Sequence, residues 1–166
     1  MTCSLPTKWR PAGWPPAPVG LRLRGIELRS RIATCARQAL GNDGVIEVGD
    51  VCARELPASR AVLLFDVLHM IPYHIQDTLL ARIAASLQSG GVLILREADA
   101  AGGWRFHIVH VANWLKGVFE GTLRRRFYFR STEQWTDRLE ALGFAVRCFS
   151  PGKDMLLANV LIEARR

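Results

Sequence analysis

Residues 61–97, AVLLFDVLHMIPYHIQDTLLARIAASLQSGGVLILRE, decide the fold that this sequence predicts. The apolar runs at 61–65 and 92–95 predict two short strands, the first of them buried on both faces. Between them, apolar residues recur at helical spacing over 73–87, and Ser-Gly-Gly at 89–91 ends that helix. Two strands joined by a crossover helix form a βαβ unit, so we expect a parallel sheet.

The same alternation of strands and helices continues on both sides of this unit. A break at 41–44 separates a helix from the next strand, and the Ser-Thr-Glu-Gln at 131–134 is typical of a capping box. We expect further strands at 20–28, 45–48, 145–149 and 156–163, and further helices at 30–40, at 104–119 and from 131 to Gly143. The pattern predicts an α/β fold with a mostly parallel sheet, closed by an antiparallel, hairpin-like strand pair at its edge.

Length and composition favour one domain with its own core. The chain has 166 residues, of which 49% are hydrophobic, and we divide it into an irregular Pro-rich segment at 1–18 and a domain at 19–166. The longest apolar stretch, 61–71, is interrupted by Asp66 and His69, which excludes a transmembrane segment. The opening has prolines where a signal peptide needs an apolar core, and the four cysteines form no C-x-x-C pair. We therefore expect a cytoplasmic protein without a disulfide framework or a thiolate zinc site.

The net charge of +7 favours acidic partners, which include nucleic acid, phosphorylated substrates and anionic membranes. The segment 124–130, RRRFYFR, interleaves cations with aromatic residues, as single-stranded nucleic-acid sites do. Alternation of this kind also suits an edge strand with its arginines outward, which is the interpretation that we prefer. A basic nucleic-acid-binding protein is thus an alternative function, and nucleic acid is not the partner that we expect.

Three carboxylates each follow a strand-like run directly: Glu27, Asp50 and Asp66. In open parallel sheets, ligands bind outside the carboxyl ends of the strands, where helix N-termini offer free N–H groups. Carboxylates in that position can accept hydrogen bonds from a diol or an amino group. We therefore expect the three acids to line one rim of the sheet.

Four motifs in this order resemble the class I S-adenosylmethionine-dependent methyltransferases. They are R-G-I-E-L at 24–28, G-D-V at 49–51, L-L-F-D-V-L-H-M-I at 63–71 and L-Q-S-G-G-V-L-I-L-R-E at 87–97. The resemblance implies a Rossmann-like sheet with an antiparallel last strand, S-adenosylmethionine as the cofactor, and methyl transfer to a small-molecule acceptor.

The resemblance also implies roles for individual residues. Glu27 would hold the ribose hydroxyls with Leu28 near the adenine, while Asp50 would accept the adenine amino group and the Val51 N–H would face a ring nitrogen. Asp66 and Val67 would form the wall beside the sulfonium and the acceptor. These six are the expected cofactor-binding residues: Glu27, Leu28, Asp50, Val51, Asp66 and Val67. No metal site is predicted.

The reaction is an in-line displacement that needs alignment, and a base only where the acceptor must lose a proton. His69 is our first candidate for that base, since it lies just past Asp66; His107 and His110 are further candidates. The segment 99–129 is rich in aromatic residues and occupies the region where the family builds its acceptor pocket. We expect a hydrophobic acceptor such as a quinone, a polyketide or a lipid-like molecule.

The chain departs from the family at its first motif. The family has a strand and an acid-x-G-x-G-x-G loop before the strand that ends here in Glu27, and in its strand order, 3-2-1-4-5-7-6, that strand is central. Only about 20 residues precede position 21, and the four prolines among 11–18 cannot donate to a central ladder. A truncated gene product, a split protein completed by a partner chain and a variant that closes the gap itself all remain open. We favour truncation, with a noncatalytic methyltransferase-like binding subunit as an alternative to an active enzyme.

Overall fold

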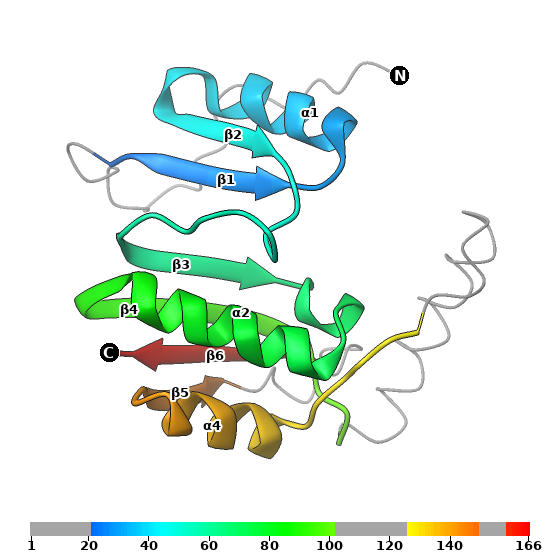
Figure 1. Ribbon diagram of the computed structural model, residues 1–166, viewed down its shortest axis with the longest axis vertical. Helices are drawn as coiled ribbons and strands as arrows, with labels where there is room; N and C mark the ends of the chain where they lie inside the picture. The colour runs from blue at the N-terminus through cyan, green and yellow to red at the C-terminus, as the bar shows by residue number, and fades with distance from the viewer. Residues whose placement is uncertain (1–20, 102–125, 150–158) are drawn as a thin grey trace. The chain divides into compact units, whose positions relative to one another are not determined.

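The computed structural model describes residues 21–101, 126–149 and 159–166 (Figure 1). It divides into two compact units, residues 1–55 and residues 56–166, and each is described by itself. The helix expected at 104–119 and the Pro-rich opening lie outside the described residues.

The first unit is a βαβ motif, formed by β1 (Leu23–Glu27), α1 (Ser30–Leu40) and β2 (Gly44–Val48). The two strands are parallel, with Glu27 opposite Val48. Helix α1 buries Ala33 and ends at Gly41, whose φ of 55° is a conformation that glycine adopts at little cost, before a 3₁₀ turn (η1, Gly41–Asp43) leads into β2. The sequence-based bounds of α1 are confirmed, and β1 begins three residues later than expected.

The second unit is a mixed sheet in the order β3-β4-β6-β5. Its strands are β3 (Ser59–Phe65), β4 (Leu87–Ala98), β5 (Ala145–Phe149) and β6 (Asn159–Arg165). Strands β3 and β4 are parallel, whereas β6 is antiparallel to both of its neighbours. The 3₁₀ turn η2 (Leu68–Met70) and α2 (Tyr73–Ser86) connect β3 to β4, and α4 (Thr132–Ala141) precedes β5. Figure 1 shows α2 and α4 over the same face of this sheet.

The core of the second unit lies between that sheet face and the two helices. Alternate strand residues point to opposite faces, so every second side chain of β4 and β6 is buried. Burying one such aliphatic side chain contributes about 1.5–3 kcal/mol. The fully buried side chains include Leu79, Leu80 and Ile83 of α2, Leu93 and Leu95 of β4, Trp135 and Leu139 of α4, and Val160 and Ile162 of β6.

The structure differs from the sequence-based prediction in the position of β6 and in the length of β4. The antiparallel pairing of the last two strands is confirmed, but β6 lies between β4 and β5, so β5 alone forms that edge. Strand β4 is longer than 92–95 and runs through the Gly90-Gly91 turn. A Cβ at Gly91 would lie 2.7 Å from the Gln88 carbonyl oxygen, which explains why this turn has no side chain there.

The capping box at the start of α4 is confirmed. The Ser131 side chain accepts the Gln134 N–H at 3.2 Å, and the Gln134 side chain accepts the Ser131 N–H at 3.0 Å. Asp99, just after β4, also accepts bonds from the Thr132 N–H (3.1 Å) and hydroxyl (2.8 Å). This carboxylate ties the beginning of α4 to the end of β4.

Candidate active site

A buried histidine–carboxylate pair lies at the carboxyl ends of β3 and β4. His69 is in η2, directly after β3, and Glu97 is the eleventh residue of the twelve-residue β4. The His69 Nδ1 atom is 2.7 Å from Glu97 Oε2, while the two residues are 9% and 1% exposed. His69 and Glu97 come into contact because β3 and β4 are parallel, so the carboxyl ends of the two strands lie side by side.

Backbone amides hold the same carboxylate from its other oxygen. Glu97 Oε1 accepts the N–H of Val67 at 2.9 Å and that of Leu68 at 2.6 Å, so the loop after β3 wraps around this side chain. A buried carboxylate is tolerated when such donors compensate its lost hydration. With Glu97 ionised, His69 Nδ1 is the donor of their bond, and Nε2 keeps a lone pair that can accept a proton.

The segment 126–130 packs against His69. The Phe129 ring is stacked on the imidazole, with centroids 5.1 Å apart and planes 7° apart, and the Phe127 ring is 5.9 Å away. The Tyr128 N–H donates to the His69 carbonyl oxygen at 2.8 Å. Residues 126–130 form no strand, so the edge-strand interpretation of 124–130 is wrong for this described part. Its aromatic residues instead contact the candidate base.

Gln76 of α2 binds the backbone of two segments that surround His69, residues 68–71 and residues 126–130. Its side-chain Nε2 lies within hydrogen-bond distance of three carbonyl oxygens, those of Leu68 (2.8 Å), Ile71 (2.9 Å) and Tyr128 (2.9 Å), which share its two N–H donors. The Gln76 side chain is fully buried. The side-chain amide of Gln76 therefore links η2, the loop after η2 and the segment 126–130 to helix α2.

Asp66 stands at the junction between β3 and η2. It is the one non-glycine residue with a positive φ (56°) among the described residues, and such conformations cluster at functional sites. Its carboxylate is paired with Arg96 of β4, and the Arg96 guanidinium lies 5.3 Å above the Phe65 ring. The hydrogen bond with Asp66 raises the pKa of Arg96 above its ordinary value.

In the first unit, Glu27 and Asp50 come to the same end of the β1–β2 pair. The Gly49 N–H donates to the Glu27 carbonyl oxygen at 3.1 Å, one residue before Asp50. Leu28 is 62% exposed, Asp50 is exposed and Val51 is half-buried. The sequence-based expectation that these acids end neighbouring strands is thus met within this unit.

Each of these carboxylates is engaged through one oxygen in the part of the chain that the structure describes. Glu27 Oε1 accepts the Arg29 N–H (3.0 Å) and Nε–H (3.1 Å), and Asp50 Oδ1 accepts the Cys52 N–H (2.8 Å). Partial burial raises the pKa of the Glu27 carboxyl, but the bonds from Arg29 outweigh it, so the pKa lies below its ordinary value. Glu27 is therefore an ionised acceptor at neutral pH.

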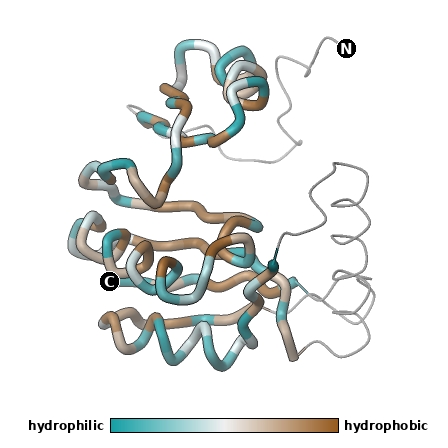
Figure 2. Tube along the Cα trace, turned by 45° about the vertical axis from the view of Figure 1, so that its right-hand side comes forward, coloured by the Kyte–Doolittle hydropathy of each residue, from teal (hydrophilic) through white to brown (hydrophobic). Residues whose placement is uncertain are grey.

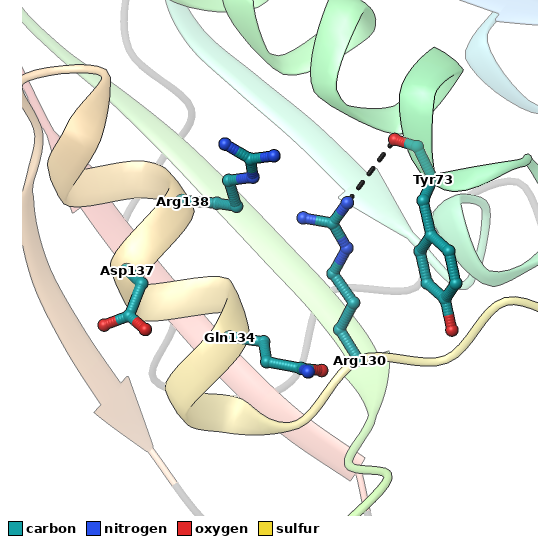
Figure 3. A pocket seen from close by; sticks show the side chains of 5 residues that line it. All are labelled: Tyr73, Arg130, Gln134, Asp137 and Arg138. Carbon is teal, nitrogen blue, oxygen red and sulfur yellow. Dashed lines mark hydrogen bonds between the residues drawn. The ribbon is translucent and has the colours of Figure 1, made fainter.

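An open pocket of about 490 Å³ lies between α2 and α4 (Figure 3), and neither His69 nor Glu97 is among the residues that line it. Two of its arginines are already matched by Asp77, which lies 2.8 Å from Arg130 and 2.7 Å from Arg138. The Arg130 guanidinium also lies 5.2 Å over the rings of both Tyr73 and Trp135. These contacts give Arg130 a structural role. The pocket is lined by Tyr73, Arg130, Gln134, Asp137 and Arg138.

The sequence analysis did not single out Glu97, although Glu97, like the three acids that it selected, follows a strand-like apolar run. Glu97 follows an apolar strand-like run just as Glu27 and Asp66 do, separated from it by a single arginine. Its partner could have been suspected because parallel strands end at the same edge of a sheet. The other two candidate bases, His107 and His110, lie outside the described residues.

No group of three or more His, Cys, Asp or Glu residues within the described part of the chain could hold a metal ion. None of the described helices is both long and apolar enough to span a membrane.

Comparison with solved structures identifies the fold. Human N-acetylserotonin methyltransferase in complex with SAM matches 87% of this chain and 40% of its own, with a TM-score of 0.62 and 19% identity. An O-methyltransferase family 2 protein from Planctomyces limnophilus, in complex with apigenin, matches 96% of this chain and 56% of its own, with a TM-score of 0.66 and 15% identity. Magnesium protoporphyrin IX methyltransferase from Synechocystis, with bound SAH, matches 86% and 63%, with a TM-score of 0.62 and 20% identity.

The chain therefore has the α/β fold of the class I S-adenosylmethionine-dependent methyltransferases, as the four motifs predicted. It spans 40% to 63% of the lengths of these three structures. Sequence comparison adds no narrower assignment, since no protein-family model matches and no curated protein gives a significant match.

The observed strand orders fit the family order that the resemblance implies. The order β3-β4-β6-β5 corresponds to 4-5-7-6, and the pair β1-β2 corresponds to strands 2 and 3.

Proposed function

We propose that this chain is the catalytic part of an S-adenosylmethionine-dependent methyltransferase that acts on a hydrophobic small molecule carrying an ionisable hydroxyl or amine. The observation that carries the proposal is the His69–Glu97 pair, buried at the carboxyl ends of two parallel strands in a class I methyltransferase fold. Such a pair can hold an imidazole in one orientation and stabilise it when it takes a proton.

Four residues of the first unit are suited to the cofactor. Glu27 and Asp50 each keep one carboxylate oxygen without a hydrogen-bond partner among the described residues, which fits acceptors for the ribose hydroxyls and for the adenine amino group. The exposed Leu28 side chain could cover the adenine, and Val51 offers a neighbouring backbone N–H. When bound, S-adenosylmethionine supplies an electrophilic methyl group on a sulfonium.

The second unit would act on the acceptor. His69 Nε2 takes the acceptor proton, and the imidazolium that forms is stabilised by Glu97, whose Oε2 is 2.7 Å from Nδ1. Asp66 and Val67 remain our candidates for the wall beside the reacting group, and the backbone of Val67 is fixed by Glu97. Phe127 and Phe129, which contact the imidazole, favour an apolar acceptor whose ring packs beside them.

We do not favour the nucleic-acid alternative, because most of the described part of the basic segment makes contacts within the protein. Arg130 is 7% exposed and paired with Asp77, while Phe127 and Phe129 pack on His69. Those groups are occupied within the protein, whereas single-strand binding needs exposed stacking rings and unpaired cations. The cytoplasmic location and the truncation both stay predictions of the sequence.

The first test is binding of S-adenosylhomocysteine to the purified chain, by calorimetry and by thermal unfolding with and without the ligand, because a ligand of the folded state raises its melting temperature. Asp50→Ala should lose the effect and Glu55→Ala, an exposed acid of the same unit, should keep it. A chain that unfolds cooperatively without any response to the ligand would contradict the cofactor assignment.

The second test is methyl transfer to a panel of apolar phenols and amines. His69→Ala should lower kcat by about 10²–10⁴-fold, the usual contribution of a general base, and leave cofactor affinity unchanged. His74→Ala is the matched control, because that histidine is exposed on α2. Equal losses in both variants would remove His69 from the mechanism. Cofactor binding without transfer to any acceptor would favour the noncatalytic binding subunit instead.

A further inference from the structure

One hydrogen bond does not by itself fix the plane of the His69 ring. Strand β3, which leads to His69, is brown, hence hydrophobic, along most of its length in Figure 2, and His69 itself is buried. Within the described residues, Glu97 is the one hydrogen-bond partner of the imidazole, through Nδ1. The terminal torsion of a histidine side chain has a broad preference, so the ring can still tilt about the bonded nitrogen. A second contact is needed to hold its plane.

Phe129 supplies a flat contact against the imidazole. The planes of the two rings are 7° apart and their centroids are 5.1 Å apart, as in stacked aromatic pairs. The Phe127 ring is tilted by 37° against the imidazole and therefore does not share its plane. The lone pair of His69 Nε2 lies in the plane of the ring. The plane that matches Phe129 thus sets the direction from which His69 accepts a proton.

Helix α2 holds the backbone of the segment 126–130. This segment forms no strand, so its position depends on contacts other than a ladder of backbone hydrogen bonds. The Tyr73 hydroxyl donates to the Phe129 carbonyl oxygen at 2.9 Å, and Gln76 Nε2 lies 2.9 Å from the Tyr128 carbonyl oxygen. Tyr73 and Gln76 are spaced i, i+3, which places them on one face of the helix.

An ion pair extends these contacts by one residue on each segment. Asp77, the next residue of α2, lies 2.8 Å from the guanidinium of Arg130, which directly follows Phe129. Arg130 is buried, and it also donates to the Tyr73 carbonyl oxygen at 3.4 Å (Figure 3). A buried charge that loses its partner is strongly unfavourable, so the ion pair keeps Arg130, and with it the adjacent Phe129, at α2.

We propose that Phe129 is a positioning residue, whose ring sets the plane of the His69 imidazole. Helix α2 keeps Phe129 in place through the side chains of Tyr73, Gln76 and Asp77. The effect on catalysis rests on the proposed function, whereas the placement of the ring can be measured without cofactor or acceptor.

The first measurement is NMR relaxation of the histidine ring C–H bonds in the full chain without ligand, because order parameters report how strongly a group is held. We expect the order parameter of the His69 ring to fall in Phe129→Leu and to stay at the wild-type value in Phe129→Tyr, which keeps the aromatic ring. The tautomer, which Glu97 sets, should not change in either variant. His74, exposed on α2, is the internal reference. An unchanged order parameter in Phe129→Leu would overturn the proposal.

Variants of α2 test the support of Phe129. Asp77→Asn and Tyr73→Phe should both lower the order parameter of the His69 ring, again with the tautomer unchanged. Asp137→Asn is the matched control, because that acid is exposed on α4, and it should behave as the wild type does. Tyr73→Phe, which removes only a hydroxyl, carries this part of the test if circular dichroism shows that Asp77→Asn is unfolded. A wild-type order parameter in Tyr73→Phe and in a folded Asp77→Asn would refute the role of α2.

Methyl transfer separates positioning from contact with the acceptor. Phe129→Leu should lower kcat by about twofold to tenfold, the equivalent of one stacked aromatic pair, with KM unchanged, and Phe129→Tyr should restore kcat. A KM that rises while kcat stays the same would make Phe129 an acceptor contact and overturn the positioning role. A wild-type chain that transfers no methyl group but shows the expected order parameters would contradict the proposed function and support the placement of His69 by Phe129.

Discussion

Replacing Glu97 by glutamine is expected to reverse the tautomer of His69. The carboxylate accepts from His69 Nδ1 and from the N–H groups of Val67 and Leu68. A glutamine can keep the two backbone donors on its amide oxygen, which places its NH₂ group against Nδ1. That group only donates, so Nδ1 must become the acceptor and the proton moves to Nε2. The candidate base then loses the lone pair that faces away from residue 97.

The cost to stability follows from the same contacts. Hydrogen bonds to a charged group contribute about 1.5–3 kcal/mol and neutral ones about 0.5–1.5 kcal/mol, so each of the two backbone bonds loses about 1 kcal/mol in Glu97→Gln. We therefore expect a decrease of about 2 kcal/mol in the free energy of unfolding. Glu97→Ala leaves those two donors without an acceptor at a site that is 1% exposed and should cost about 3–5 kcal/mol.

The assay combines two measurements on each variant. Urea unfolding gives the free energy of unfolding, and ¹⁵N-detected NMR of the histidine side chains reports which ring nitrogen carries the proton. His74, exposed on α2, is the internal reference and should not change. If His69 keeps its tautomer in Glu97→Gln, or if Glu97→Ala is as stable as the wild type, the pair does not hold the imidazole in the way that we argue.

Three further predictions concern the helix ends and the rim. Ser131→Ala removes the cap of α4 and should lower the free energy of unfolding by about 1 kcal/mol in urea titrations, while Ser131→Thr should restore most of it. Gly143→Ala, at a φ of 85° after α4, should cost about 1–2 kcal/mol by the same measurement, and a neutral result would mean that the turn rearranges. In a ¹³C NMR titration, the pKa of the Glu27 carboxyl should lie below the ordinary value of a glutamate carboxyl, and it should rise in Arg29→Ala. Because the pKa of Glu27 is lower in the folded state than in the unfolded state, this carboxyl contributes to stability above its unfolded pKa. That contribution to the free energy of unfolding decreases as the pH falls through the folded pKa. A free energy of unfolding that rises over the same range would contradict the Arg29 contacts.

The parts of the fold that depend on local pattern could be predicted from the sequence. The helix at 30–40, the capping box at 131–134 and the helix that connects β3 to β4 each follow from spacing within about fifteen residues, which sequence periodicity reports well. The position of β6 could not be predicted in this way. Whether it lies at the edge or between β4 and β5 depends on pairing across the sheet, to which its own alternating pattern contributes little.

In the candidate site, too, the residues with a local sequence pattern could be predicted, whereas the contacts that depend on strand pairing could not. Strand-end acids could be found because each stands beside its own apolar run, as Glu27 and Asp66 do. The partnership of His69 with Glu97 was missed because the two are 28 residues apart and meet only through the register of β3 against β4. The positive φ of Asp66 has only a weak sequence signal, since aspartate adopts that conformation more often than most residues do but still in a small minority of cases.

The side-chain amide of Gln76 has a consequence for how this site forms during folding. Its three acceptors belong to η2, to the loop after it and to the segment around Tyr128, which is 52 residues further along the chain. Bringing two residues so far apart in the chain into contact costs more conformational entropy than forming a short-range contact does. The environment of His69 is therefore complete only after α2 has docked and the distant segment has arrived, so we expect the amide of Tyr128 to become protected late in refolding, after those of α2.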